Sequence, residues 1–212
     1  MAADLLLEAR GVAAQRGHAT VFTGVHFALR SGEALVVRGP NGSGKTTLLR
    51  IVAGLTMPSG GEVRWQGDAM RAFDARLRSV VAFNGHAPAL KDELTAFENL
   101  DAWTSLHGAP VSSDKIAEAL DSVALSRRHR LPVRALSQGQ RRRIGLARLA
   151  LCDRALWILD EPLTALDAEA VDVLGELLAR HLAANGIWIA ASHQLLPLEA
   201  SRMKSLSLGE PS

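Results

Sequence analysis

The segment Gly39-Pro40-Asn41-Gly42-Ser43-Gly44-Lys45-Thr46 matches the phosphate-binding pattern G-x-x-x-x-G-K-[ST] at every fixed position. Its glycines allow the backbone to turn tightly, so that successive N–H groups can point at phosphate oxygens without a Cβ in the way. Lys45 adds a mobile positive charge for the outer phosphates, and the Thr46 hydroxyl is placed to ligate Mg²⁺. Together with Thr47, these residues form the predicted nucleotide site.

The residues on either side of the loop support this prediction. Residues 33–38 are expected to form a short buried strand, and residues 47–53 a helix that ends at Gly54. Such a helix directs its positive end toward the bound anion. An ordinary glycine-rich turn is the alternative, but it requires neither the strand nor the helix.

The composition indicates a globular protein without a membrane span. The chain has 212 residues, of which 48% are hydrophobic, enough for one large domain or for one domain with a subdomain. Its longest apolar runs, residues 155–159 and 187–191, are far shorter than the ~20 residues that cross a bilayer. The N-terminus lacks the basic start and long apolar core of a secretion signal, so we expect a cytoplasmic chain. The single Cys152 builds no disulfide framework and is expected in the core.

The net charge of the chain does not indicate a particular class of binding partner. The formal net charge is only +2, although arginines cluster at residues 127–130 and 141–143. Such clusters could contact the phosphates of nucleic acid, lipid or nucleotide. A solvated helix face is the commoner explanation, and we expect it here.

The first part of the chain is predicted to be rich in β-strands. Short apolar stretches between residues 5 and 38 form a β region that leads into the nucleotide loop. After the loop helix, residues 62–65 and 80–83 form further strands. β structure is therefore expected on both sides of the loop.

From about residue 85 to residue 150 the pattern becomes helical. Thr95 and Glu98 match a capping box, in which the hydroxyl and the carboxylate satisfy free N–H groups at a helix start. Ser113 is expected to cap a second helix. These residues are predicted to form a small helical subdomain.

The stretch Leu136-Ser137-Gln138-Gly139-Gln140 is predicted to start a further helix and to form a second anion site. Ser137 and Gln140 match a capping box, and Gly139 lets the backbone approach a ligand closely. The helix directs its positive end to the same place. Taken alone, this stretch is better explained by a plain helix start.

Two adjacent acids follow the buried strand predicted for residues 155–159. Open α/β sheets bind ligands at the carboxyl ends of their strands. Asp160 is therefore expected to hold Mg²⁺, directly or through water, and Glu161 to orient the attacking water or take its proton. Solvated turn residues are the alternative, but the phosphate loop upstream favours the catalytic role.

His193 follows the next buried strand, predicted for residues 187–191. A neutral, hydrogen-bonded structural histidine is one interpretation. Because this strand has the pattern of the same sheet, we expect His193 to reach the γ-phosphate instead.

Five motifs, in this order, resemble the ATP-binding cassette of ABC transporters. They are Gly39–Thr46, Leu136–Gln140, Leu159-Asp160-Glu161-Pro162, Ala165-Leu166-Asp167 and His193. The resemblance covers nearly the whole chain. It implies an α/β fold, with a P-loop NTPase core of the ABC type, an antiparallel β subdomain and an α-helical subdomain.

The resemblance also implies how a single ABC ATPase domain over residues 1–212 is divided. Residues 1–84 would hold the β subdomain and the first part of the core. Residues 85–153 would form the helical subdomain, which ends in the signature helix, and residues 154–212 would complete the core.

The same resemblance implies the ligands and the assembly. It implies ATP with Mg²⁺, and a head-to-tail homodimer in which ATP lies between the P-loop of one chain and Leu136–Gln140 of the other. Glu161 then corresponds to the catalytic base, His193 to the switch histidine and Asp167 to a dimer contact. Integral membrane transporter subunits are the expected partners, since the sequence itself has no membrane span.

Four further stretches strengthen and narrow the resemblance. They are Val63–Gly67, Gly85-His86 with Pro88 and Leu90-Lys91, Leu94–Leu100, and Leu156–Pro162. With the length of 212 residues, they are similar to the ATP-binding subunit of the haem exporter in bacterial cytochrome c maturation. This implies a peripheral place on the cytoplasmic side of the inner membrane.

In that family, ATP hydrolysis drives the release of haem from its chaperone. Haem would be handled by the partner subunits and by that chaperone, and no nucleic acid is expected. A cassette that exports another substrate is the alternative.

The chain departs from the family pattern in two places. The glutamine that usually ends the strand before the helical subdomain is missing, and His86 stands near that position. The chain also has no tyrosine, so the aromatic ring that usually stacks on adenine is absent. Arg16, His18 or Phe22 could supply a flat surface, and we expect loose selectivity for the base.

Two other functions fit parts of the sequence. The basic clusters permit an ABC ATPase that acts on DNA or on ribosomes, but such proteins usually carry two cassettes, long coiled coils or zinc modules. A small P-loop kinase would need an acceptor site and a lid, whereas residues 85–150 end in the signature helix.

Overall fold

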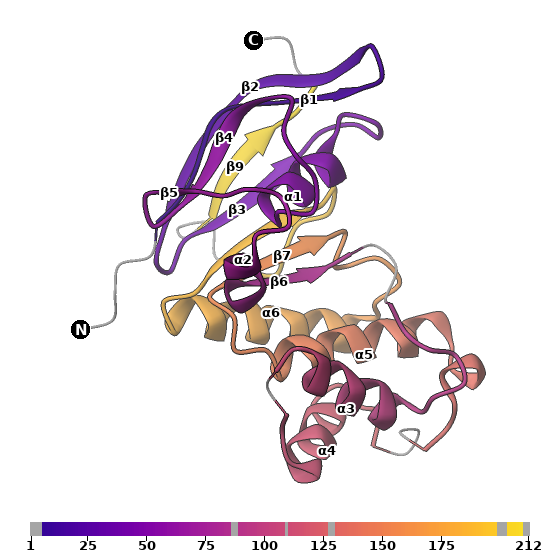
Figure 1. Cartoon of the computed structure of the whole chain (residues 1–212). Coiled ribbons are helices and arrows are strands. Elements are labelled where there is room, and N and C mark those ends of the chain that lie inside the picture. The colour runs from indigo at the N-terminus through magenta and orange to yellow at the C-terminus, as the bar shows by residue number, and fades with distance from the viewer. Residues whose placement is uncertain (1–5, 86–88, 109, 127–129, 199–202, 210–212) are drawn as a thin grey trace. The chain divides into compact units, whose positions relative to one another are not determined.

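Two units, each with its own packed elements, make up the chain in the computed structural model (Figure 1). The structure describes residues 6–85, 89–108, 110–126, 130–198 and 203–209, without the side chain of Arg78. Unit 1 comprises residues 1–85, 154–162 and 178–212. Unit 2 comprises residues 86–153 and 163–177.

The first sheet of unit 1 is antiparallel and is centred on strands β1 (Leu6–Arg16) and β4 (Gly60–Trp65). Strand β2 (Ala19–Arg30) pairs with β1 and the short β5 (Asp68–Ala69) with β4, which gives the order β2-β1-β4-β5. The sequence pattern predicts only short strands before the loop. Strands β1 and β2 are longer because shifts in their pairing register let the ladder continue where the apolar alternation breaks.

The second sheet of unit 1 is parallel, with the order β6-β7-β8-β3-β9. Its strands are β3 (Ala34–Arg38), β6 (Val81–Asn84), β7 (Leu156–Asp160), β8 (Ile187–Ala191) and β9 (Met203–Ser207). Strands β7 and β8 are buried along their whole length, as central parallel strands are. The sequence pattern does not predict β9, because this edge strand has no apolar run.

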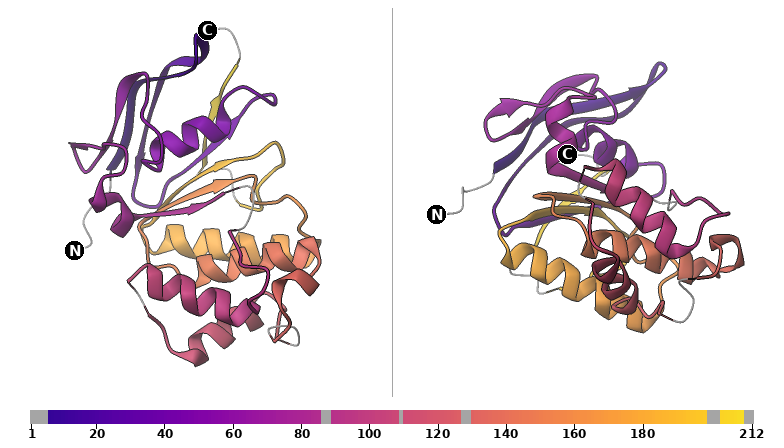
Figure 2. Two further views of the ribbon diagram at one scale, coloured as in Figure 1. Left: turned by 45° about the vertical axis from the view of Figure 1, so that its right-hand side comes forward. Right: turned by 60° about the horizontal axis from the view of Figure 1, so that its bottom comes forward.

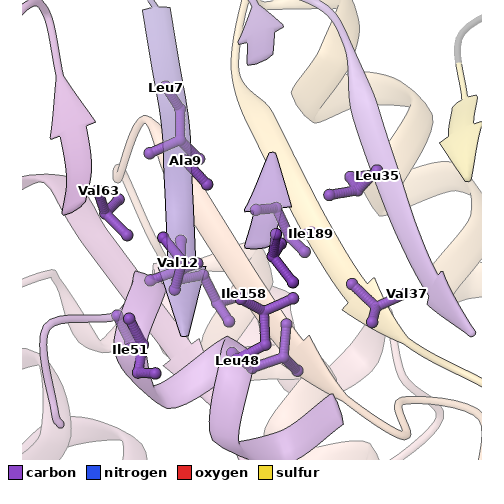
Figure 3. Packing of buried hydrophobic residues seen from close by; sticks show 14 of the residues in the cluster. Leu7, Ala9, Val12, Leu35, Val37, Leu48, Ile51, Val63, Ile158 and Ile189 are labelled. Carbon is purple, nitrogen blue, oxygen red and sulfur yellow. The ribbon is translucent and has the colours of Figure 1, made fainter. Parts of the chain in front are cut away.

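Helix α1 (Lys45–Val52) anchors the nucleotide loop in the core of unit 1. Its Leu48 and Ile51 belong to one hydrophobic cluster with Val12 of the antiparallel sheet and Ile158 of the parallel sheet (Figure 3). Both helix residues are nearly inaccessible to solvent, so the start of α1 is fixed by packing. A short helix, α2 (Ala75–Val80), precedes β6.

Unit 2 is helical. It contains α3 (Ala96–Leu106), α4 (Ser113–Asp121), a 3₁₀ helix (Val133–Ala135), α5 (Gln138–Ala150) and the first part of α6 (Ala168–Ala183). Helices α3, α4 and α5 lie beside one another in both views of Figure 2. No helix in the described part of the chain is long and apolar enough to cross a membrane.

The helix starts of unit 2 test two sequence predictions. The capping box of Thr95 and Glu98 at the start of α3 is confirmed. The prediction for α4 is wrong by one residue, because the hydroxyl of Ser112, not that of Ser113, accepts a hydrogen bond from the N–H of Lys115. Ser113 is instead the first residue inside the helix.

Candidate nucleotide site

The nucleotide loop has the backbone that a phosphate cradle needs. Gly39, Gly42 and Gly44 have φ angles of 144°, 86° and 94°, which side-chain-bearing residues rarely adopt. A Cβ at Gly39 would lie 2.3 Å from the carbonyl oxygen of Leu208. Gly44 is the N-cap of α1, and no side chain caps this helix. The first N–H groups of α1 are therefore available to an anion.

Two polar side chains of the loop are buried. Lys45 is 8% exposed, and its Nζ donates to the carbonyl oxygens of Gly39 (2.8 Å) and Pro40 (3.1 Å). The buried Oγ of Ser43 has no hydrogen-bond partner among the described residues. Burying a hydroxyl without a partner costs about 1–3 kcal/mol. A phosphate in the loop would give this hydroxyl a partner and the ammonium group an anion, so the residues present fit such a ligand.

Thr46 and Asp160 bring a hydroxyl and a carboxylate together in the site. Asp160 ends β7 and is 4% exposed. The Thr46 hydroxyl donates to the Asp160 carboxylate, with oxygen distances of 2.9 and 3.2 Å. A hydroxyl and a carboxylate are hard oxygen ligands of the kind that Mg²⁺ uses together with phosphate and water. No cluster of three or more His, Cys, Asp or Glu in the described residues could enclose a metal by itself.

Glu161 and His193 meet because β7 and β8 are neighbouring parallel strands, which end at the same edge of the sheet. Oε2 of Glu161 lies 2.9 Å from Nδ1 of His193. The Glu161 side chain is 18% exposed and that of His193 62%. Glu161 has a φ of 50°, and its N–H donates to the carbonyl oxygen of Ala191 at 2.9 Å. An uncommon backbone angle of this kind is frequent at functional sites.

The second predicted anion site lies at the start of α5. Ser137 Oγ accepts from the N–H of Gln140 (3.2 Å), and Gln140 Oε1 accepts from the N–H of Ser137 (3.0 Å). The predicted capping box is therefore confirmed. Leu136 is buried, whereas Ser137 and Gln138 are exposed beside Gly139. This arrangement exposes a helix N-terminus in unit 2.

The arginines of α5 do not form the solvated face that the sequence suggests. Arg142 and Arg143 are only 8% and 7% exposed. Arg143 bonds to Asp167 and Glu169, so its charge is paired inside unit 2. The prediction is wrong for these two residues because consecutive helix positions point in different directions, and a run of charges therefore cannot lie on one face. Residues 127–129 of the other cluster lie outside the described residues.

The replacements proposed for the missing family residues differ in their setting. Phe22 is 8% exposed and packs against Gly44, where a Cβ would lie 2.8 Å from its ring. Arg16 and His18 are exposed at the turn between β1 and β2. These two side chains, and not Phe22, are free to offer a flat surface to a base. His86 lies outside the described residues.

The predicted residues thus fall into two sets, one in each unit. Unit 1 holds the nucleotide loop with Asp160, Glu161 and His193, and unit 2 holds Leu136–Gln140 and Asp167. The sequence profile of ABC transporters matches residues 22–164.

The chain belongs to the ABC transporter family. It is an ATPase of that family, and its fold class agrees with the one predicted from the five motifs.

Relatives of this ABC ATPase carry a common name. The chain is 46% identical over 199 residues to the cytochrome c biogenesis ATP-binding export protein CcmA 2 of Cupriavidus metallidurans, which covers 94% of each chain. It is 45% identical over 197 residues to the protein CcmA of Pseudomonas aeruginosa, which covers 93% of this chain and 97% of that one. The predicted resemblance to the ATP-binding subunits of cytochrome c maturation is confirmed.

Solved structures of ABC ATPases have the same fold. An ABC transporter ATP-binding protein from Pyrococcus furiosus superposes with a TM-score of 0.81 at 25% identity, over 96% of this chain and 97% of that one. A dimeric ATP-binding cassette in a post-hydrolysis state, bound to ADP and Pi, superposes with a TM-score of 0.78 at 22% identity, over 96% of this chain and 97% of that one.

In this ABC ATPase, the sequence pattern did not predict that Arg143 is buried and paired with acids. One signal could have found it, since Arg143 lies four residues after Gly139 and therefore faces the same side of α5. The acids that pair with it follow much later in the chain, at Asp167 and Glu169. Only the fold brings them together.

Proposed function

We propose that this chain is the ATP-hydrolysing subunit of the haem exporter of bacterial cytochrome c maturation. The observation that carries the proposal is the sequence identity of 45–46% to two CcmA proteins. In each comparison the alignment covers more than nine tenths of this chain and of the CcmA protein. The proposal places the chain on the cytoplasmic side of the inner membrane, bound to integral membrane subunits. Haem and its chaperone are contacted by those subunits.

The nucleotide loop binds the phosphates of ATP. The segment Gly39–Thr47 supplies backbone N–H groups from every residue except Pro40, and Lys45 moves from its carbonyl partners to the outer phosphates. Thr46 and Asp160, already in contact with each other, hold Mg²⁺. When bound, Mg²⁺ neutralises charge that develops on the phosphates during transfer. Their direct hydrogen bond supports this assignment because it brings both oxygens to one place.

Glu161 orients the attacking water and accepts its proton. The carboxylate is fixed by its place at the end of β7 and by its contact with His193. His193, more exposed than Glu161, contacts the γ-phosphate and keeps the carboxylate aligned. Phosphoryl transfer depends on such positioning more than on covalent chemistry by the protein.

Hydrolysis requires a second copy of the chain. The exposed N-terminus of α5, with Ser137, Gln138 and Gly139, contacts the γ-phosphate of the ATP that is bound by the partner chain. Asp167 lies in the segment that meets the partner. Two ATP molecules close the homodimer, and hydrolysis opens it again.

The proposal is tested by purifying the tagged chain from native membranes and identifying what is bound to it. We expect two small multi-span membrane proteins and a haem-bearing chaperone, with haem visible in the absorption spectrum. Other permeases without haem would contradict the haem-export assignment and leave the ATPase mechanism intact. Bound nucleic acid with steep salt dependence would instead favour an ABC ATPase that acts on DNA or ribosomes.

Arg16 and His18 are the exposed candidates for contact with the base. We expect the exposed guanidinium plane of Arg16 to stack on the base, because the ring of Phe22 is buried, and the exposed imidazole of His18 is the alternative. A guanidinium stacks on any base, so GTP should support hydrolysis. An absence of GTP hydrolysis where ATP is hydrolysed would contradict this expectation.

A further inference from the structure

Two segments of unit 2, both assigned to the dimer contact in the proposed function, are in direct contact with each other. The first is the start of α5 and the second is the segment 165–169, which leads into α6. A Cβ at Gly139 would lie 3.2 Å from the carbonyl oxygen of Ala165, so the two backbones approach closely. Ala165 has a φ of 61°, which is uncommon for a residue with a side chain. The segment therefore adopts an uncommon backbone conformation where it meets α5.

Arg143 makes a second link, one helical turn further along α5. It faces the same segment as Gly139 because residues four apart share one face of a helix. Its Nη2 donates to both carboxylate oxygens of Asp167, at 2.7 and 2.8 Å, and to Oε2 of Glu169 at 2.8 Å. The Arg143 side chain is 9% exposed, whereas those of Asp167 and Glu169 are 65% and 68% exposed.

The guanidinium group is also held from another side. Its Nη1 donates to the carbonyl oxygen of Val123, in the turn after α4, at 2.9 Å. Asp167 also makes a second contact, since its Oδ1 accepts a hydrogen bond from the N–H of Ala170 at the start of α6. The hydrogen bonds from Arg143 and Ala170 hold the pKa of Asp167 below its ordinary value, so the ion pair is present at neutral pH.

We propose that Arg143 is a positioning residue, which fixes the segment 165–169 against α5 so that both contact the second cassette as one rigid surface. The inference rests on the proposed function, in which that surface acts on the partner chain's ATP. The carboxylate of Asp167 then acts within its own chain, and the backbone and neighbouring side chains of its segment meet the partner. Arg143 itself touches no nucleotide.

A purely structural arginine is the alternative that the test must exclude. If Arg143 only stabilised unit 2, its loss would weaken every property in proportion to the loss of folded protein. A positioning role predicts a split instead. ATP binding by the chain's own loop, in unit 1, stays unchanged, while ATP-driven dimerisation is lost.

The experiment uses the full chain with Glu161→Gln, which we expect to bind ATP without hydrolysing it. Arg143→Met is compared with Arg143→Lys and with Ile116→Ala. Ile116 is completely buried in α4, so its truncation destabilises unit 2 without removing any hydrogen bond or ion pair to the segment 165–169. For each variant, ATP affinity is measured by equilibrium dialysis, dimerisation with ATP by sedimentation velocity, and stability by thermal unfolding.

We expect Arg143→Met to weaken ATP-driven dimerisation by roughly tenfold or more, with ATP affinity of the single chain within about twofold of the parent. Arg143→Lys keeps the charge but not the forked geometry, and should restore dimerisation in part. Ile116→Ala should dimerise like the parent despite an equal or larger fall in melting temperature. If Arg143→Met and Ile116→Ala lose dimerisation in the same proportion to stability, the positioning role is wrong.

A second variant pair tests the link itself. Once Arg143 is replaced by Met, the further change Asp167→Ala should cost little additional dimerisation, because the two residues act as one unit. Full additivity of the two losses would overturn the inference. If the Glu161→Gln parent binds ATP but does not dimerise, the proposed dimer mechanism fails, and the inference fails with it.

Discussion

The residue sets of unit 1 and unit 2 are held in place by different kinds of structure. In unit 1 the nucleotide loop is shaped by glycine backbone and anchored to buried strands and to α1. In unit 2 the start of α5 is held by side chains, namely the Ser137–Gln140 capping box and the Arg143 ion pairs. The proposed nucleotide site in unit 1 is therefore shaped before any ligand binds, whereas the surface in unit 2 depends on polar contacts that single substitutions remove.

The largest expected effect comes from the carboxylate of Glu161. Glu161→Gln keeps the size of the side chain but removes its ability to accept a proton, so turnover should fall by roughly 10²-fold or more. ATP affinity should stay near the wild-type value, because the loop proposed to bind phosphate is unchanged. Parallel measurements of ATP turnover and equilibrium binding check both points, and retained turnover would contradict the role of Glu161.

Loss of the loop ammonium group should affect binding itself. Lys45→Ala removes a charge-assisted contact to phosphate, which is expected to lower ATP affinity by about ten- to a hundredfold. Lys204→Ala is a matched control, since Lys204 also lies in unit 1 but pairs with Glu33 at the surface. Equal ATP affinities for the two variants, measured by isothermal titration, would show that Lys45 does not contact the nucleotide.

The contribution of the glycine backbone of unit 1 to stability can be tested separately from ATP binding and turnover. Gly39→Ala should destabilise the chain by about 2 kcal/mol, because the new Cβ strains the backbone and meets the carbonyl of Leu208. Gly17→Ala also places a side chain at positive φ, but with nothing within 4 Å, and should cost about 1 kcal/mol. Urea unfolding monitored by tryptophan fluorescence measures both. Equal losses of stability in the two variants would mean that the backbone at Leu208 shifts to accommodate the added Cβ.

The two capping boxes of unit 2 give a matched pair. Ser137→Ala and Thr95→Ala should each cost about 1 kcal/mol of stability, since each removes one helix cap. Only Ser137→Ala should also lower ATP turnover, because only α5 is assigned to the second nucleotide. Turnover that falls equally in both variants would mean that stability alone explains the effect.

The smallest expected effect is a difference in acid sensitivity between the His181 contact of unit 1 and the Asp167 ion pair of unit 2. His181 stacks on Trp157 with ring centroids 4.0 Å apart, and burial lowers its pKa below the ordinary value of 6.5. The unfolded chain therefore binds a proton near pH 6.5 that the folded chain does not, so stability is full above pH 6.5 and falls as the pH drops below it. The pKa of Asp167 is lowered from 3.8, so its pairing with Arg143 in unit 2 persists through this range.

Unfolding midpoints at about pH 7.5 and about pH 5.5 check this difference. His181→Gln should unfold at more similar denaturant concentrations at the two pH values than the wild type does. An unchanged pH dependence in this variant would show that His181 does not account for the acid sensitivity.

Local sequence patterns predicted the elements whose signals are short and continuous. The nucleotide loop, the strand before Asp160 and the capping box at Ser137 each lie within a few residues, where steric and hydrogen-bonding rules act directly. The edge strand β9 gave no signal, because its stability comes from pairing with β3 and not from its own composition.

Contacts between distant residues were beyond the reach of the sequence. The run of arginines at 141–143 is typical of a solvated face, and only the position of Asp167 and Glu169 in the fold explains why Arg143 is buried. The contact between Glu161 and His193 was predictable in part, since both were expected at the ends of strands in one sheet.

The most direct test of the account is the amount of haem-bearing c-type cytochrome in cells whose only copy of this protein carries Glu161→Gln. The account predicts that the variant assembles with its membrane partners at the wild-type level, while covalently bound haem, detected by haem staining of membrane proteins, is lost. Wild-type amounts of haem-bearing cytochrome in these cells would contradict the claim that ATP hydrolysis at this site drives cytochrome c maturation.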